Sequence, residues 1–121
     1  MIEKVKLRIE TPDSNCLELE ANGVIIPAAQ GDITILSERA PSVFSLDYGV
    51  VQLLNADLKV KDKYYITSGA ADVANGVIKL MTGRILHADK ISKDEALAKA
   101  ESDVFYRMIA DKLENKTEKY T

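Results

Sequence analysis

Short runs in which apolar and polar residues alternate fill most of residues 1–88, and this pattern constrains the fold more than any other feature. Val5, Leu7 and Ile9, for example, alternate with basic residues. Alternation with a period of two gives a β-strand one buried and one solvated face. The Asn-Gly pair at 75–76 suits a two-residue hairpin, because both residues tolerate a positive φ. Many short strands with no helical pattern between them predict an antiparallel β-sandwich of about ten strands.

The boundaries of the later strands follow from the turn residues that separate the apolar runs. The run at 23–27 is apolar on both faces and ends at Pro27, which lacks a ladder donor and belongs at a strand end or an edge. Beyond it we predict strands at 33–36, 43–46, 50–54, 58–60, 64–68, 71–74 and 77–82.

Helical periodicity begins where the strand pattern ends. Ser92 and Glu95 form a serine-x-x-glutamate capping box, which typically opens a helix. No glycine or proline lies between Ser92 and Asn115, so we expect one long helix rather than a helical hairpin. The chain is therefore predicted to be an α+β protein, with a β-sandwich docking domain at 1–88 and a C-terminal helical segment at 89–121.

One side of the predicted helix is assigned to packing on the sandwich. At about 100° per residue, four apolar residues gather on that side. They are Leu97, Ala100, Val104 and Met108. Phe105, Ile109 and Leu113 drift away from this side, so we expect them to face a partner or a short return segment.

Charge and composition exclude several classes of function. The formal net charge is −3, whereas surfaces that bind nucleic acid or anionic membranes carry basic patches. No apolar run approaches the ~20 residues of a membrane span, and no signal or transit peptide precedes the first strand pattern. The single cysteine, Cys16, cannot form an internal disulfide, which favours a reducing compartment. We expect a soluble intracellular protein that neither binds nucleic acid nor inserts directly into a membrane.

No group of residues indicates catalysis, a metal site or a cofactor. His87 is the only histidine and has no partner visible in the sequence, so we interpret it as a surface or junction residue. Cys16 has neither a helix N-terminus nor a basic neighbour to activate it, and is expected to be a small, half-buried apolar residue. Glu18 and Glu20 share one strand face but lack an apolar pocket that would divide them into acid and base. The chain is therefore not expected to be an enzyme.

Two polar corners flank the predicted strand at 33–36. One is Gln30-Gly31-Asp32, and the other is the segment 37–41, which reads Ser-Glu-Arg-Ala-Pro. Neither corner carries a nucleophile with a base, a metal-ligand cluster or a phosphate-binding glycine loop. Charged corners of this kind are typical of a docking surface on loops held by a rigid scaffold.

The order of these features resembles the epsilon subunit of bacterial F-type ATP synthase, the counterpart of the mitochondrial delta subunit. The resemblance extends over about residues 3–105. It is carried by Thr11-Pro12, Pro27, Gly31-Asp32, Ile35-Leu36, Arg39-Ala40-Pro41, Leu46, Gly49-Val50-Val51, Tyr65-Ile66, Ser68-Gly69-Ala70, Val73, Ile91, Glu95, Ala96 and Ala100. Each motif is short, but their shared order and spacing make the signal specific.

The resemblance implies a non-catalytic rotor subunit that helps couple proton flow to ATP synthesis. Family members place a β-sandwich at the foot of the central stalk, on the gamma subunit and the membrane-embedded c-ring. For this chain the resemblance implies gamma and the c-ring as partners, the catalytic alpha/beta head as a further contact, and a peripheral location on the cytoplasmic face of the bacterial inner membrane. It also implies that both polar corners lie at one end of the sandwich and dock there. Their residues are Gln30, Gly31, Asp32, Ser37, Glu38, Arg39, Ala40 and Pro41.

The C-terminal segment departs from the family pattern. Residues 89–121 show no second capping signal and are shorter than the family's full helical hairpin, so an inhibitory arm is expected to be reduced or absent. Some relatives bind ATP through the pattern isoleucine-aspartate-x-x-arginine-alanine. Here Ser92 stands in place of the aspartate and Glu95 in place of the arginine, which reverses the charge that a phosphate needs. We therefore predict no nucleotide-binding site.

Two other functions remain open from the sequence. A free-standing β-sandwich adaptor would share the fold and bind a different protein. A small hydrolase would use Cys16 or His87, and replacing both by alanine would abolish its activity.

Overall fold

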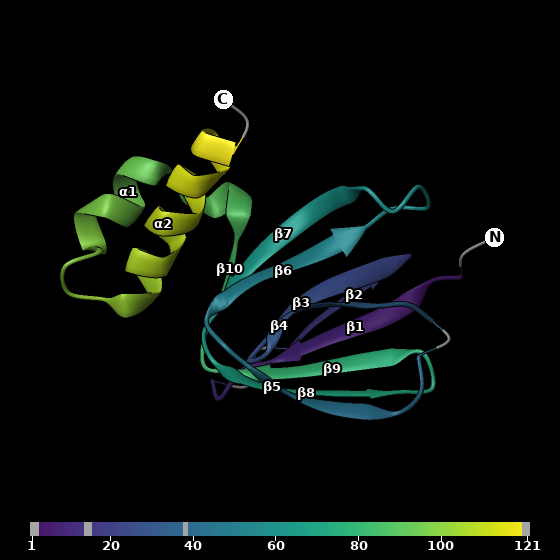
Figure 1. Cartoon of the computed structure of the whole chain (residues 1–121). Helices are drawn as coiled ribbons and strands as arrows, with labels where there is room; N and C mark the ends of the chain where they lie inside the picture. The colour runs from purple at the N-terminus through teal and green to yellow at the C-terminus, as the bar shows by residue number, and fades with distance from the viewer. Residues whose placement is uncertain (1–2, 14–15, 38, 120–121) are drawn as a thin grey trace.

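The computed structural model describes residues 3–13, 16–37 and 39–119. Within these residues the chain forms ten strands followed by a 3₁₀ turn and two α-helices (Figure 1). The strands are β1 (Val5–Glu10), β2 (Cys16–Ala21), β3 (Gly23–Ala28), β4 (Gly31–Ile35), β5 (Ser42–Leu46), β6 (Gly49–Leu54), β7 (Val60–Ile66), β8 (Gly69–Ala74), β9 (Val77–Thr82) and β10 (Ile85–His87). The predicted α+β class, with a sandwich of about ten strands before a helical segment, is confirmed.

The strands form one sheet in the order β10-β7-β6-β3-β5-β8-β9-β1-β2, and β4 pairs with β3 beside this path. Neighbours pair antiparallel except β1 and β9, which are parallel. Figure 1 shows the sheet curled over, with β5, β8 and β9 across from β3, β6 and β7. The core lies between these two layers.

Alternation along the strands explains the core. In β1 the residues Val5, Leu7 and Ile9 are each 1% exposed, while the basic residues between them face solvent. They join buried aliphatic side chains of β3, β6, β8 and β9 in one cluster. Burial of this kind contributes roughly 25 cal/mol per Å² of apolar surface removed from water.

One pair of predicted strands is wrong. The single strand β7 (Val60–Ile66) takes the last residue of the run at 58–60 and the first three residues of the run at 64–68. Leu58 lies in the turn before it with a left-handed φ of 59°. Asn55 stabilises this turn, because its side-chain oxygen accepts hydrogen bonds from the amides of Asp57 (2.9 Å) and Lys59 (3.1 Å). An apolar residue in a left-handed turn position is uncommon, so the local pattern gave no sign of it.

The prediction of one long helix is also wrong. After η1 (Ala88–Lys90), the segment forms α1 (Lys93–Lys99) and α2 (Val104–Lys119), which pack side by side (Figure 1). Ser92 caps α1 as predicted, since its hydroxyl accepts from the amide of Glu95 at 3.2 Å. No helix in the described part of the chain is long and apolar enough to cross a membrane.

The two helices pack through a different face from the one predicted. Leu97 and Val104 are 45% and 57% exposed, whereas Phe105 and Ile109 are 2% and 0% exposed. The buried set packs with Tyr65 of β7 in a second apolar cluster, separate from the sandwich core. The prediction for Leu97 and Val104 fails because α1 buries the face of Ala96, and α2 buries the face of Phe105 and Ile109. Ala100 and Met108 are partly buried.

Candidate docking interface

The corner at Gln30-Gly31-Asp32 is the tip of the β3–β4 hairpin. Ala28 pairs with Gly31, so the turn consists of Ala29 and Gln30. Gly31 has a φ of 129°, a value that side chains rarely adopt. Gln30, Gly31 and Asp32 are all exposed. A hairpin held by its ladder loses little conformational entropy when it docks.

The loop between β5 and β6 lies directly beside this tip. The amide of Ala29 donates to the Ser45 carbonyl and that of Asp47 to the Pro27 carbonyl, both at 2.9 Å. Gly49 allows the approach, since a Cβ there would lie 2.6 Å from Cβ of Pro27. We call residues 30–32 with 47–48 the hairpin end. Its exposed Asp32 and Asp47 make it acidic.

The second corner, residues 37–41, lies at the other end of the sandwich. β4 runs five residues from Gly31 to Ile35, a length of about 17 Å at 3.3 Å per residue. The strand therefore separates the two corners. At the end of β3 away from the hairpin, the side chain of Leu36 packs against Gly23, where a Cβ would lie 2.8 Å from Cδ2 of Leu36. The expectation that both corners form one end of the sandwich is wrong.

Several contacts fix the described part of this second corner. The amide of Arg39 donates to the Leu36 carbonyl at 3.1 Å, and its guanidinium carbon lies 5.3 Å from the ring centroid of Phe44. The Ser42 hydroxyl donates to the Ala40 carbonyl at 2.9 Å. Arg39, Ala40 and Pro41 are exposed and Ser37 is partly buried, while Glu38 lies outside the described residues.

A groove of about 570 Å³ separates the hairpin end from α2. Asp32 and Asp47 lie on one side, Lys112 and Leu113 on the other, and Tyr65 lines it as well. Burial raises the pKa of the Tyr65 phenol. Among the residues that the structure describes, no group of three or more histidine, cysteine or acidic side chains could hold a metal ion.

His87 has a partner that the sequence did not reveal. The β10–β7 register pairs His87 with Tyr64, and the Nε2 atom lies 2.6 Å from Oδ1 of Asp62. The Nδ1 atom accepts from the Asp89 amide at 3.1 Å, which caps η1. Because both ring nitrogens are engaged, this arrangement leaves neither to act as a general base. The residue ties β10 to β7.

Cys16 and the strand carboxylates occupy solvated positions. Cys16 is exposed rather than half-buried as predicted, because β2 is an edge strand. Glu18 forms an ion pair with Arg8 at 3.4 Å on the same solvated face.

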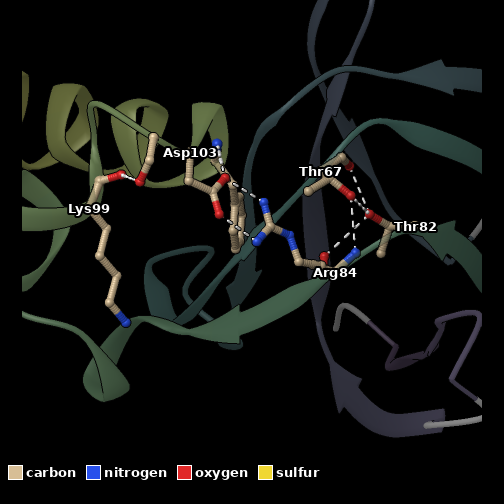
Figure 2. Close-up of polar contacts among 7 residues, drawn as sticks. Thr67, Thr82, Arg84, Lys99 and Asp103 are labelled. Carbon is tan, nitrogen blue, oxygen red and sulfur yellow. Dashed lines mark hydrogen bonds and ion pairs between the residues drawn. The ribbon is translucent and has the colours of Figure 1, made fainter.

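An ion pair that sequence reasoning missed joins the sheet to the helices. Arg84 follows β9 and donates two hydrogen bonds to the carboxylate of Asp103, of 2.6 Å and 2.8 Å (Figure 2). One carboxylate oxygen also accepts from the amide of Phe105 at 3.0 Å, and the guanidinium lies 4.6 Å from the Phe105 ring centroid. Hydrogen bonds from Arg84 hold the pKa of the Asp103 carboxyl at about 2. We call Arg84 and Asp103 the clasp.

Buried threonines fix the backbone of the clasp. The Arg84 amide donates to the hydroxyl oxygen of Thr67 at 3.0 Å, and the hydroxyls of Thr67 and Thr82 lie 3.0 Å apart (Figure 2). Thr82 donates to the Thr67 carbonyl at 2.8 Å. These hydrogen bonds hold the backbone of the connection between β9 and β10, which carries Arg84.

The positions that match the ATP-binding pattern serve the cap of α1. The hydroxyl of Ser92 lies 3.3 Å from a carboxylate oxygen of Glu95 and also accepts from its amide.

Comparison with known proteins connects this fold to one family. Residues 4–88 match the family model described as the beta-sandwich domain of the ATP synthase delta/epsilon chain. The ATP synthase epsilon chain of Rhodopirellula baltica is 30% identical over 92 residues, which cover 76% of this chain and 70% of that one. The epsilon chain of Desulfitobacterium hafniense is 30% identical over 95 residues, covering 78% and 70%.

Solved structures share the fold. A chain in the cryo-EM structure of Euglena gracilis mitochondrial ATP synthase, OSCP/F1/c-ring in rotational state 1, has a TM-score of 0.63 at 21% identity and covers 89% of this chain and 73% of that chain. A chain of the Tetrahymena thermophila mitochondrial ATP synthase central stalk and c-ring has a TM-score of 0.56 at 14% identity, covering 90% and 96%. Since the family model spans the whole sandwich, the chain belongs to the ATP synthase delta/epsilon family.

Proposed function

We propose that this protein is a non-catalytic subunit of the central stalk of a proton-translocating F-type ATP synthase. The observation that carries the proposal is the family match over the whole sandwich, residues 4–88. The relatives named ATP synthase epsilon chain support the same role. In this role the subunit links gamma to the c-ring, turns with both, and lies peripherally on the cytoplasmic face of the bacterial inner membrane.

The two corners serve different contacts in this proposal. The hairpin end docks on the polar loops of the c-ring, since its tip is exposed, rigid and acidic. Residues 37–41 lie about 17 Å away along β4, so a flat partner at the hairpin end does not reach them. They belong to the contact with gamma. Charges at the rim of such contacts set orientation and association rate more than affinity.

Native mass spectrometry tests the assignment. Mixed with the gamma-containing catalytic head of its own synthase, the chain should form a 1:1 complex. No complex at micromolar concentration would favour the free-standing adaptor.

A charge reversal tests the hairpin end. Asp32→Lys combined with Asp47→Lys should weaken binding to the detergent-solubilised c-ring by about tenfold. Asp72→Lys is the matched control, because Asp72 is exposed on β8 away from the hairpin end. Equal binding by the double variant and the control would contradict this docking site.

A further inference from the structure

Strand β2 lies beside β1 at one end of the sheet (Figure 1). Its other edge pairs with no strand among the residues that the structure describes. The pairing with β1 extends over all six residues of β2 and has no register shift. A regular edge strand without a bulge or a proline is a template on which another chain can add a strand. The chemical groups along this edge decide which chain that is.

Strand register fixes which backbone groups of β2 point to the open edge. In an antiparallel pair, residues that bond to the neighbouring strand alternate with residues whose N–H and C=O point away from it. The Lys6 amide donates to the Gly76 carbonyl, on the side of β9, at 3.0 Å, so the backbone groups of Lys6 point away from β2. Glu20 is the partner of Lys6 in the register. Glu20, and Glu18 two residues before it, therefore direct N–H and C=O to the open edge.

A lysine of β7 agrees with this direction and closes one end of the edge. The Lys61 ammonium donates to the Glu20 carbonyl at 3.0 Å, which requires that this carbonyl point away from β1. Within the described chain, both backbone groups of Glu18 and the amide of Glu20 stay available to a further strand.

The core face of β2 is incompletely covered at this edge. Leu17 and Leu19 pack against the sandwich core but are only partly buried. Their partners in β1, Ile9 and Leu7, are each 1% exposed, because β1 has a strand on both sides. An added strand with apolar residues opposite the two leucines would complete their burial.

The solvent face of the edge is acidic and selects the kind of partner. Glu18 and Glu20 point to this face, and the Glu18 side chain is 72% exposed. Opposite charges directly across a strand pair stabilise the pair, and like charges destabilise it. Two antiparallel copies of β2 would place glutamate against glutamate, so the edge disfavours self-pairing. It favours a strand that has lysine or arginine opposite the glutamates.

Strand β1 is an example of such a partner within the same sheet. It alternates apolar residues with Lys6 and Arg8, and Arg8 forms an ion pair with Glu18 at 3.4 Å. We propose that the open edge of β2 binds another protein by strand addition. The bound segment is extended, runs antiparallel to β2, and alternates apolar residues with lysine or arginine. Main-chain hydrogen bonds supply the affinity, and the glutamates select the sequence. This contact does not depend on the central-stalk role.

Amide exchange of the full chain with a synthetic peptide tests the proposal. The peptide has the sequence of residues 4–9 with acetylated and amidated ends, because it repeats the β1 pattern. At ten times the dissociation constant measured by NMR titration, it should slow exchange of the Glu18 and Glu20 amides about tenfold. The Leu17 and Leu19 amides, which face β1, should change little. Unchanged exchange at Glu18 would overturn the proposal. So would faster exchange at Leu19, because the peptide would then have displaced β1.

Charge variants distinguish selection by the glutamates from general adhesion of a peptide. An acidic peptide, with glutamate in place of both lysines and the arginine, should bind about tenfold more weakly. Glu18→Lys combined with Glu20→Lys should reverse this preference. Asp72→Lys makes the same change on the central strand β8 and should keep it. Equal affinity of the unchanged chain for the two peptides would contradict the proposed selection.

N-methylated peptides test the backbone bonds without any change to the protein. In the proposed register the peptide arginine lies opposite Glu18, so its amide faces β2, whereas the amide of the peptide leucine faces away. N-methylation at the arginine should raise the dissociation constant at least about tenfold, since main-chain bonds supply the affinity. N-methylation at the leucine should leave it nearly unchanged. The reverse order would rule out this register. Protection of the same amides at high protein concentration without peptide would assign the edge to a second copy of the chain instead.

Discussion

At the scale of single residues, Gly69 shows how closely two backbones approach in this sandwich. A Cβ at this position would lie 1.9 Å from the Met81 carbonyl oxygen, and no side-chain rotation relieves a clash with backbone. We expect Gly69→Ala to lower the free energy of unfolding by about 3 kcal/mol, as overpacking does. Urea denaturation of the unchanged and variant proteins measures this loss of unfolding free energy. Gly76→Ala is the comparison, because Gly76 has open space but a φ of 75°, and should lose only about 1 kcal/mol. Equal losses would contradict the steric account.

Asp103 gives the second prediction at this scale, a dependence of helix docking on pH. Hydrogen bonds from Arg84 lower the pKa of its carboxyl from 3.8 to about 2. A depressed folded-state pKa means that the contribution to stability is complete above pH 3.8 and is lost as pH falls through about 2. Amide exchange in α2 should therefore accelerate between pH 4 and 2, after correction for intrinsic rates. In Asp103→Asn this acceleration should disappear, and its persistence would assign the effect to other carboxylates.

At the scale of elements, Phe105 should decide whether the helix pair stays on β7. Phe105→Ala removes a side chain that is 2% exposed, a change that typically costs 3–5 kcal/mol, or about 4 kcal/mol here. We expect α1 and α2 to lose amide protection while the sandwich keeps its own. Val104→Ala, one residue earlier and 57% exposed, should change protection little. If Val104→Ala were the more damaging variant, the face assigned to packing would be wrong.

Elements defined by short-range pattern could be predicted from the sequence, and those defined by long-range contacts could not. The alternation in β1 and the capping box of α1 operate over a few residues, and both predictions hold. The residues of the clasp stand 19 apart in the chain, and His87 and Asp62 stand 25 apart. The β10–β7 register brings His87 to Asp62, whereas Arg84 meets Asp103 only because the helix pair packs beside the sheet. The helix break lies between Lys99 and Val104, and no glycine or proline between Ser92 and Asn115 marks it in the sequence. The polar corners are neighbours in sequence but lie at opposite ends of β4, because an extended strand separates its ends.

At the scale of the whole molecule, the sandwich and the helix pair have separate apolar cores. The sandwich core contains strand residues alone, and the second cluster joins both helices to Tyr65 and its neighbours. Deleting residues 91–121 should therefore leave a folded sandwich that still binds the gamma-containing head. Because the helical segment is short and held down by the clasp, we expect the deletion to change ATP hydrolysis by the assembled enzyme less than twofold. Hydrolysis assays with the full chain and the truncated chain measure this. A several-fold rise on deletion would show instead that the segment reaches the catalytic head and restrains it.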